Sequence, residues 1–500
     1  MPRHTPSRLP VAILLAALSL PAPEGEAESS LADPFATGDR VAAGAERSVR
    51  DRGEADRCPP PPAAAWRLAE VIDQALCRNP KTRQAWATAR AQAAQVGASQ
   101  AAYLPSVTIS SNAARSANAS NAVGSNQQLT TIQTLGGGAS SSREQFRVTP
   151  QVSLNYLLFD FGGRAARLDN ALHALNAANW SHDAAIQSVL LAAIQAYYQV
   201  FASGAAVDSA RAALRSSEDA WRAAEVRHQV GSAALADALQ AKTAFAQARV
   251  NLQTAEGNAR IAAGSLANAM GLPADRDVLI EAPVMVDPDP VQDQDVHRLM
   301  EEAKALRPDL AAAEAQVRAA EANVTVAKSV ALPTVSLAGN YGYGYSSVLA
   351  ASESWSVGLQ LSIPLFTGFA NTYQIRGAEE QVEIQRASRE QLEQTVSLDV
   401  WRAYHQLDTA RATLLASNDL IASAGQSERV ALGRYRAGAG SILDLLSAQA
   451  GLANARQQNI QARFAWLTQK AVLAQAIGRL DLDSVRAGSD PRHSHSVRTP

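Results

Sequence analysis

The chain has 500 residues, a formal net charge of −2 and 5% aromatic residues. A charge so near zero provides no basic surface for nucleic acid, which excludes the common classes of DNA- and RNA-binding protein. With 2 cysteines and 8 scattered histidines, no metal cage and no cofactor site is expected. Alanine dominates the composition, which favours long helices packed closely through small side chains.

The N-terminus has the features of a secretory signal peptide, assigned to residues 1–27. Two arginines precede an apolar run (Val11 to Leu20) that is too short to cross a bilayer as a helix. Cleavage is expected after Ala22 or Ala27. Residues 28–64 are rich in Ser, Pro, Glu and Arg without a sustained apolar period, so a disordered leader is predicted there.

The two cysteines, Cys58 and Cys77, bracket the start of the first predicted helix. An exported chain meets an oxidising compartment, where a disulfide between them would attach the leader to that helix. The alternative is a pair of unpaired or incidental thiols, and both interpretations stay open.

The first repeat is assigned to residues 66–272. A helix is predicted over 66–103, where apolar residues recur at a spacing of three to four, and Pro105 ends it. Alternation with a period of two follows. A loop rich in Ser, Asn, Gly and Thr (111–145) interrupts it, and it resumes over 146–158. Two strands joined by a long surface loop are therefore predicted.

A very long helical hairpin completes this repeat. From 164 to 228 the sequence has no proline and a single glycine, which predicts one helix of about 95 Å. Gly231 ends that helix, and a second one returns to Met270. The hairpin is either an ordinary structural coiled coil or part of a hollow cylinder formed when copies assemble. The pattern does not by itself show hollowness.

The second half of the chain repeats this order. After a linker rich in Asp and Pro (273–296), residues 297–480 contain a helix, two alternating segments and another long hairpin, and a flexible tail (481–500) follows. Matching residues lie 228 positions apart in the early part, as with Pro80 and Pro308, and 207 apart in the hairpins. A period of this size indicates a duplicated unit rather than a short-repeat solenoid.

The alternating segments are apolar on one face and polar on the other, and they have the length of outer-membrane barrel strands. In lipid every backbone group must be hydrogen-bonded, so such strands must close into a ring, and four strands cannot enclose a channel. Several copies would have to share one barrel. The alternative is a small soluble antiparallel sheet with one buried face. The export signal and the long flanking helices favour the membrane interpretation.

Three features together resemble the TolC-type outer-membrane efflux family. They are Leu-Pro entering a strand, a strand ending in Phe-Asp-Phe-Gly-Gly or Pro-Leu-Phe-Thr-Gly, and the tip Arg-Tyr-Arg-Ala-Gly-Ala-Gly-Ser-Ile-Leu-Asp-Leu-Leu (434–446). The likeness covers about 66–480. It implies an α+β membrane protein, internally duplicated, in the outer membrane of a Gram-negative bacterium. Four strands per protomer would form a trimeric 12-stranded barrel, and the helical hairpins would form a periplasmic tunnel.

The resemblance also implies a function and partners. A homotrimer would carry substrate to the exterior from a periplasmic adaptor (membrane fusion) protein and an inner-membrane ABC or other pump. The members that it resembles most export a protein toxin by type I secretion. A small-molecule (drug) efflux duct of the same architecture and a soluble periplasmic coiled-coil scaffold are the alternatives. No zinc-protease helix, phosphate loop or nucleophile elbow supports an enzyme.

The family places its closed aperture at the hairpin tips. In that pattern Asp444 matches the first position of an acidic ring and Ser447 matches the second, so a thinner ring is expected here. Tyr435 matches an aromatic residue of the gate, whereas Gly440 stands where an arginine is found in the family. Asp237, in the first tip, has the weaker case for the aperture.

The same pattern assigns adaptor docking to the tips, at Arg227, Gly231, Arg434 and Gly438. The two glycines are expected to allow tight turns. The two arginines either pair with the tip aspartates or are solvated, as most surface charges are. Ser441, three residues before Asp444, is also a helix-capping pattern, so Asp444 could serve the helix start, the aperture or both.

Overall fold

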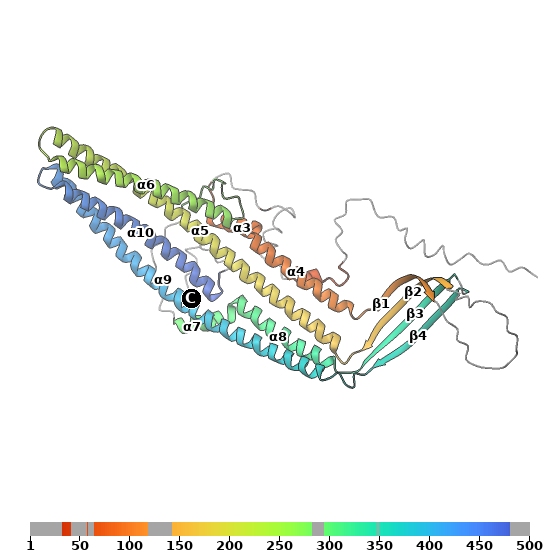
Figure 1. Ribbon diagram of the computed structural model, residues 1–500. Coiled ribbons are helices and arrows are strands. Elements are labelled where there is room, and N and C mark those ends of the chain that lie inside the picture. Colours follow the sequence, from red (N-terminus) through yellow and green to blue (C-terminus); the bar gives the residue numbers. More distant parts are fainter. Residues whose placement is uncertain are drawn as a thin grey trace, which may run out of the picture.

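The structure, a computed structural model, describes residues 33–41, 58, 65–118, 143–282, 295–347 and 350–480. Within them the chain forms a long helical body with a four-stranded sheet at one end and two helical hairpin tips at the other (Figure 1). The predicted signal peptide, most of the predicted leader and the tail 481–500 lie outside the described residues.

Each repeat supplies two shorter helices, two strands and a long hairpin. In the first repeat these are α3 (Leu68–Arg78), α4 (Pro80–Ala101), β1 (Ser106–Asn118), β2 (Arg143–Phe159), α5 (Gly163–Gln229) and α6 (Leu235–Ala269). In the second they are α7 (Val296–Leu306), α8 (Pro308–Ser329), β3 (Thr334–Ser346), β4 (Ser352–Ser362), α9 (Ala370–Arg436) and α10 (Ile442–Ile477). Both long helices, α5 and α9, have 67 residues, which corresponds to about 100 Å.

The single helices predicted over 66–103 and from 297 to Pro333 are wrong, because each is broken near its start. Asn79 is extended between α3 and α4, with φ −64° and ψ 129°, and its side chain accepts from the Lys81 amide at 3.0 Å. The cause is the following Pro80, which disfavours helical backbone at the residue before it and is well suited to the first position of a helix. The Arg307-Pro308 step breaks the second repeat in the same way.

The disorder predicted over 28–64 is wrong for residues 33–41, which include a short 3₁₀ helix, η1 (Thr37–Arg40). The Asp33 carboxylate accepts from the Gly38 amide at 2.8 Å and from the Thr37 hydroxyl at 3.2 Å, and these backbone and side-chain hydrogen bonds lower the pKa of Asp33. Val41 then packs among apolar residues of α4 and α5. Composition does not reveal such a local motif.

The strands form one antiparallel sheet in the order β1-β2-β3-β4. Strands β1 and β2 extend to Asn118 and from Arg143, so both enter the range 111–145 that was predicted to be loop. The register lines up the apolar residues in rows across the sheet. One row is Ile109, Val152, Tyr341 and Trp355.

This apolar face is open to the surroundings in the single chain. The Trp355 and Ile109 side chains are 78% and 71% exposed. The opposite face is polar, as shown by the hydrogen bond from Gln151 to Asn340 at 3.1 Å. The predicted alternation therefore places apolar side chains on one side and polar ones on the other, as a barrel wall in lipid requires.

The helical body packs mainly through a cluster at the level of α3, where α5, α6 and the linker meet. Residues of the linker take part, since Val278 is buried and Ile280 pairs with Trp66. Among the described helices, α5 alone is long and apolar enough by composition to cross a membrane, with a mean hydropathy of 1.3 in its most apolar stretch. It packs against α4, α6, α8 and α10, so its apolar residues serve the helical body.

In each repeat, a glycine at the end of the long hairpin lies against the end of the first short helix. Gly271 ends the first hairpin with φ +70°, and a Cβ there would lie 2.7 Å from the backbone of Arg78, at the end of α3. Gly478 ends the second hairpin with φ +86°, and a Cβ there would lie 3.0 Å from the backbone of Leu306, at the end of α7. Both positions need a residue without a side chain, because the backbone is left-handed and another backbone lies in contact.

Candidate functional site: the hairpin tips

The tips of the two hairpins lie side by side at the end of the molecule farthest from the sheet (Figure 1). Each turn contains a glycine with left-handed backbone, Gly231 with φ +81° and Gly438 with φ +76°. A Cβ at either glycine would meet nothing within 4 Å. Glycine is therefore favoured at these two positions by the left-handed backbone and not by close packing.

One arginine connects the two hairpins. The Arg227 guanidinium, near the end of α5, donates to the Tyr435 carbonyl at 2.7 Å and lies over the Tyr435 ring with 4.1 Å to the centroid. Tyr435 is only 5% exposed and belongs to an apolar cluster that includes Ala224, Ile442 and Leu445. The tips are thus held by apolar packing together with a charged hydrogen bond and a cation–π contact.

This contact differs from the arginine–aspartate pairing that the sequence left open. Within the described residues, neither Arg227 nor Arg434 forms an ion pair with Asp237 or Asp444. Arg434 points to the Ala439 carbonyl within its own turn, at 3.5 Å. Sequence reasoning missed the Arg227–Tyr435 contact because its acceptor is a backbone carbonyl, which no residue pattern identifies.

The helix-capping role at the second tip belongs to Ser441. Its hydroxyl accepts from the Asp444 amide at 3.1 Å, as an N-cap does. The Asp444 side chain is exposed, and it lines a groove between α9 and α10 together with Ser447, Arg434 and Gly440. The two matched positions of the predicted acidic ring, Asp444 and Ser447, therefore share one surface, and capping does not occupy the Asp444 carboxylate.

Asp237 has a different environment. It lies in the first turn of α6, where a carboxylate interacts favourably with the helix dipole. Its amide donates to the Ala234 carbonyl at 3.1 Å, and its side chain is half-buried. Nothing in this arrangement directs Asp237 toward the groove of Asp444.

The first tip also exposes a set of large apolar side chains. Val230 is 71% exposed, and the matching position of the second tip is Ala437. Leu235 is 56% exposed, whereas its match, Ile442, is buried. The tips are therefore unequal at these positions. The exposed large apolar side chains of the first tip are Val226, Val230, Leu235 and Leu239, and those of the second are Val430 and Leu443.

Away from the tips, the structure joins Cys58 and Cys77 in a disulfide, with 5.7 Å between their Cα atoms. The bond ties the leader to the end of α3. Within the described residues there is no group of three or more His, Cys, Asp or Glu side chains that could hold a metal ion.

Comparison with known proteins agrees with this architecture. The model of the family described as outer membrane efflux protein matches residues 71–272 and 299–479, one segment in each repeat. Protein CyaE of Bordetella pertussis is 33% identical over 86% of this chain and 88% of its own length. The pyoverdine export outer membrane protein OpmQ of Pseudomonas aeruginosa is 28% identical over 65% of this chain and 69% of its own.

Solved structures show the same fold. The CmeC outer membrane channel of Campylobacter jejuni superimposes with a TM-score of 0.70 at 18% identity, covering 86% of this chain and 90% of that one. The predicted fold class, a four-stranded contribution to a barrel carried on long helical hairpins, is confirmed. The predicted family is confirmed as well, since its model spans both repeats. The chain belongs to the outer membrane efflux protein family: it is an outer-membrane channel that extends into the periplasm, and it is not an enzyme.

Proposed function

We propose that three copies of this chain form one channel-tunnel and that β4 of each copy pairs with β1 of the next. The observation that carries this proposal is the sheet itself. It has two outer strands, β1 and β4, and one apolar face. A strand edge cannot stay unpaired in lipid, and four strands are too few to close around a passage.

The tips are the gate of this tunnel. Arg227 and Tyr435 hold the two hairpins of a copy together, so opening requires the hairpins to separate. Three Asp444 carboxylates near the axis would repel one another and attract cations. With Ser447 in the second position, this ring has a single acidic layer.

A periplasmic adaptor protein docks at the tips, and an inner-membrane ABC or other pump supplies the energy. The exposed apolar side chains of the first tip support this role, because contiguous apolar surface on a soluble part of a protein marks an interaction site. Val230 and Leu235 would be covered by the adaptor, with Gly231, Gly438 and the tip arginines forming the rest of the contact.

The cargo is a protein toxin exported by type I secretion. The support is the resemblance to the toxin-exporting members of the family and the 33% identity to protein CyaE over most of both chains. Small-molecule export is the second candidate, and it is favoured by the 28% identity to OpmQ, whose name describes pyoverdine export.

Deletion of the gene distinguishes these cargoes. Loss of a large protein from the culture supernatant, with unchanged sensitivity to small toxic compounds, supports type I secretion. Increased sensitivity with an unchanged set of secreted proteins contradicts it and supports the second candidate. Complementation with the wild-type gene must restore whichever property is lost.

Assembly is tested separately on the purified protein. Three copies per particle should be found in detergent by native mass measurement, and the protein should need detergent to leave the membrane fraction. A monomer that high salt releases from membranes would contradict the barrel.

A further inference from the structure

The described part of the leader, residues 33–41, lies across α4 and α5. Thr37 and Val41 are each 5% exposed. Val41 packs with Ala89, Ala93 and Leu175, and the Arg40 carbonyl accepts from the Asn179 side chain at 3.2 Å. Side chains of this segment therefore contact both helices and cover the seam between them.

Gly97 of α4 lies against this segment. A Cβ there would lie 3.4 Å from the Thr37 methyl carbon and 4.0 Å from the Phe35 ring. At these distances the Cβ of an alanine would be in ordinary van der Waals contact with the leader. A side chain longer than alanine would occupy the place of Thr37.

The second repeat offers an internal comparison, because the duplication identifies the matching positions. Asn179 matches Arg386 at the offset of 207, and Ala93 matches Glu321 at the offset of 228. In the second repeat these two residues form an ion pair at 2.7 Å. The place taken by the leader in one half is thus taken by a salt bridge in the other.

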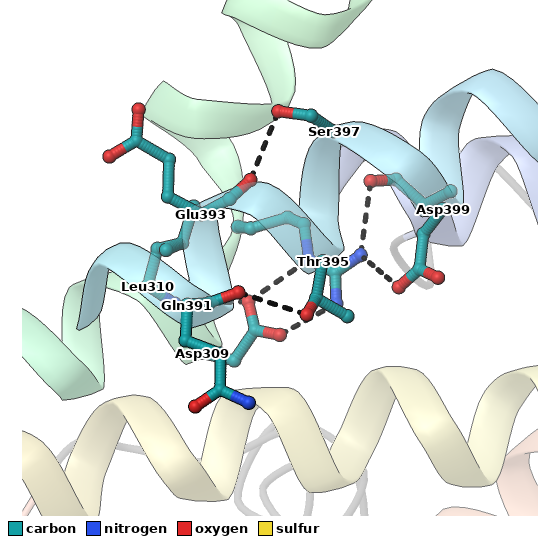
Figure 2. A network of polar contacts seen from close by, with 9 residues as sticks. Asp309, Leu310, Gln391, Glu393, Thr395, Ser397 and Asp399 are labelled. Atoms are coloured by element: carbon teal, nitrogen blue, oxygen red, sulfur yellow. Dashed lines mark hydrogen bonds and ion pairs between the residues drawn. The ribbon is translucent and has the colours of Figure 1, made fainter. Parts of the chain in front are cut away.

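Further ion pairs continue this connection in the second repeat. Arg389 of α9 pairs with Glu314 of α8 at 2.8 Å. Figure 2 shows the polar contacts nearer the start of α8, where Asp309 and Asp399 approach one guanidinium, that of Arg307, at 2.6 and 3.5 Å. Polar and charged contacts therefore join α8 to α9 over several turns.

We propose that residues 33–41 are an intramolecular strap that clamps α4 to α5, performing in the first repeat what the ion pairs perform in the second. The Cys58–Cys77 disulfide keeps the strap near its seat by fixing the other end of the leader at α3. The two repeats then differ in what weakens the contact between their helices. In the first repeat, protease or loss of apolar contact would release the strap from α4 and α5. In the second repeat, salt weakens the exposed ion pairs between α8 and α9.

A pair of substitutions at Gly97 tests the strap. Alanine and leucine favour helix almost equally, so Gly97→Ala and Gly97→Leu differ mainly in their effect on the strap. The measurement is the rate of tryptic cleavage after Arg40 in the purified full-length protein, followed by mass spectrometry. Wild type and Gly97→Ala should be cut slowly. Gly97→Leu should be cut at least about tenfold faster, because cleavage follows the fraction of open strap.

Equal rates in all three proteins, or a wild-type rate equal to that of a free peptide with the sequence of 33–41, would overturn the proposal. Since Gly97→Leu alters a helix of the body, a second variant lies in the strap itself. Val41→Asp places a carboxylate in the apolar seat and should also accelerate cleavage after Arg40, while substitution of the exposed Asp39 by Asn should not. This experiment needs no assumption about cargo or gating, so its outcome is independent of the proposed function.

Discussion

The guanidinium of Arg227 on the first hairpin lies 4.1 Å from the ring centroid of Tyr435 on the second, and it also donates to the carbonyl of the same tyrosine. Two interactions with one residue make this contact sensitive to movement of the hairpins. If the tips separate, both interactions are lost together and the buried Tyr435 ring is uncovered. The contact therefore stabilises the arrangement in which the two tips lie together relative to any arrangement in which they are apart.

Arg227→Ala should shift the tip toward opening. A hydrogen bond from a charged donor contributes about 1.5–3 kcal/mol and a cation–π contact about 0.5–2 kcal/mol. Their loss should raise the open fraction about tenfold or more. The measurement is the frequency of channel openings in a planar lipid bilayer. Tyr435→Phe is the matched control, because it keeps both the ring and the backbone acceptor, and it should behave as wild type. Equal opening frequencies in Arg227→Ala and wild type would contradict the proposed role.

The proposed aperture role of Asp444 and the capping role of Ser441 can be tested separately by substitution. Asp444→Asn removes a carboxylate from the proposed aperture without removing the backbone amide that Ser441 caps. It should reduce the preference of the channel for cations, with little change in thermal stability. Ser441→Ala should lose about 1 kcal/mol of stability through the missing cap and leave ion selectivity unchanged. Reversal potentials in asymmetric salt and thermal unfolding measure the two properties. The same selectivity in Asp444→Asn and wild type would remove Asp444 from the aperture.

The glycines at hairpin ends and hairpin turns should respond differently to alanine. At Gly231 only the left-handed backbone opposes a side chain, which costs about 1–2 kcal/mol. At Gly271 a Cβ also meets the Arg78 backbone at 2.7 Å, which should add about 1–3 kcal/mol of packing strain. Gly271→Ala should therefore lower the thermal transition of the assembled protein clearly more than Gly231→Ala. Similar transitions would mean that α3 can move away from this junction at little cost.

Because Cys58 and Cys77 are paired, we expect the unreduced protein to contain no free thiol. Alkylation of the denatured, unreduced protein should add no mass, and reduction should allow two adducts, one on each of Cys58 and Cys77. Because the bond closes a loop with a sequence separation of 19, its loss should destabilise the leader and α3 by on the order of 3 kcal/mol. Cys58→Ser should therefore increase hydrogen exchange in α3 and leave α9 unchanged. Alkylation of the unreduced protein at both cysteines would show that they are not paired.

Long-range features of the fold could be predicted from sequence because they rest on periodicity. Alternation located the strands, and the absence of proline from 164 to 228 gave the long helix almost to its ends at Gly163 and Gln229. Because of the duplication, each element was predicted in both halves of the chain. Such patterns repeat over many residues, so one irregular position does not obscure them.

Single-residue features were harder to predict. Pro80 breaks a helix whose apolar spacing continues on both sides, and in the leader a few side-chain hydrogen bonds order residues 33–41. At the tip, the decisive contact is between Arg227 and a carbonyl, and sequence pattern carries no information on backbone acceptors. The contacts at the tips depend on how residues far apart in the sequence meet in the fold, whereas the architecture follows from periodic patterns along the sequence.

Tyr197 makes stability depend on pH in the alkaline range. Its hydroxyl donates to the Glu281 carbonyl at 2.6 Å. Burial first, and then the nearby charges of Tyr198, Glu281 and Glu70, raise the pKa of Tyr197 from 10.0 to about 12. The neutral phenol is therefore favoured in the folded protein. Its stabilising contribution is complete below the unfolded-state pKa and is lost as the pH rises from about 10 to about 12.

Tyr197→Phe provides the test, because it removes the titrating group and keeps the ring. At pH 8 the variant should be less stable than wild type by about 1 kcal/mol, the contribution of one hydrogen bond. Above pH 10 the difference should shrink, since wild type alone must then keep a phenol protonated or bury its charge. Denaturant unfolding of both proteins between pH 8 and pH 12 measures this difference. Parallel stability curves across that range would show that the Tyr197 hydroxyl does not link folding to protonation.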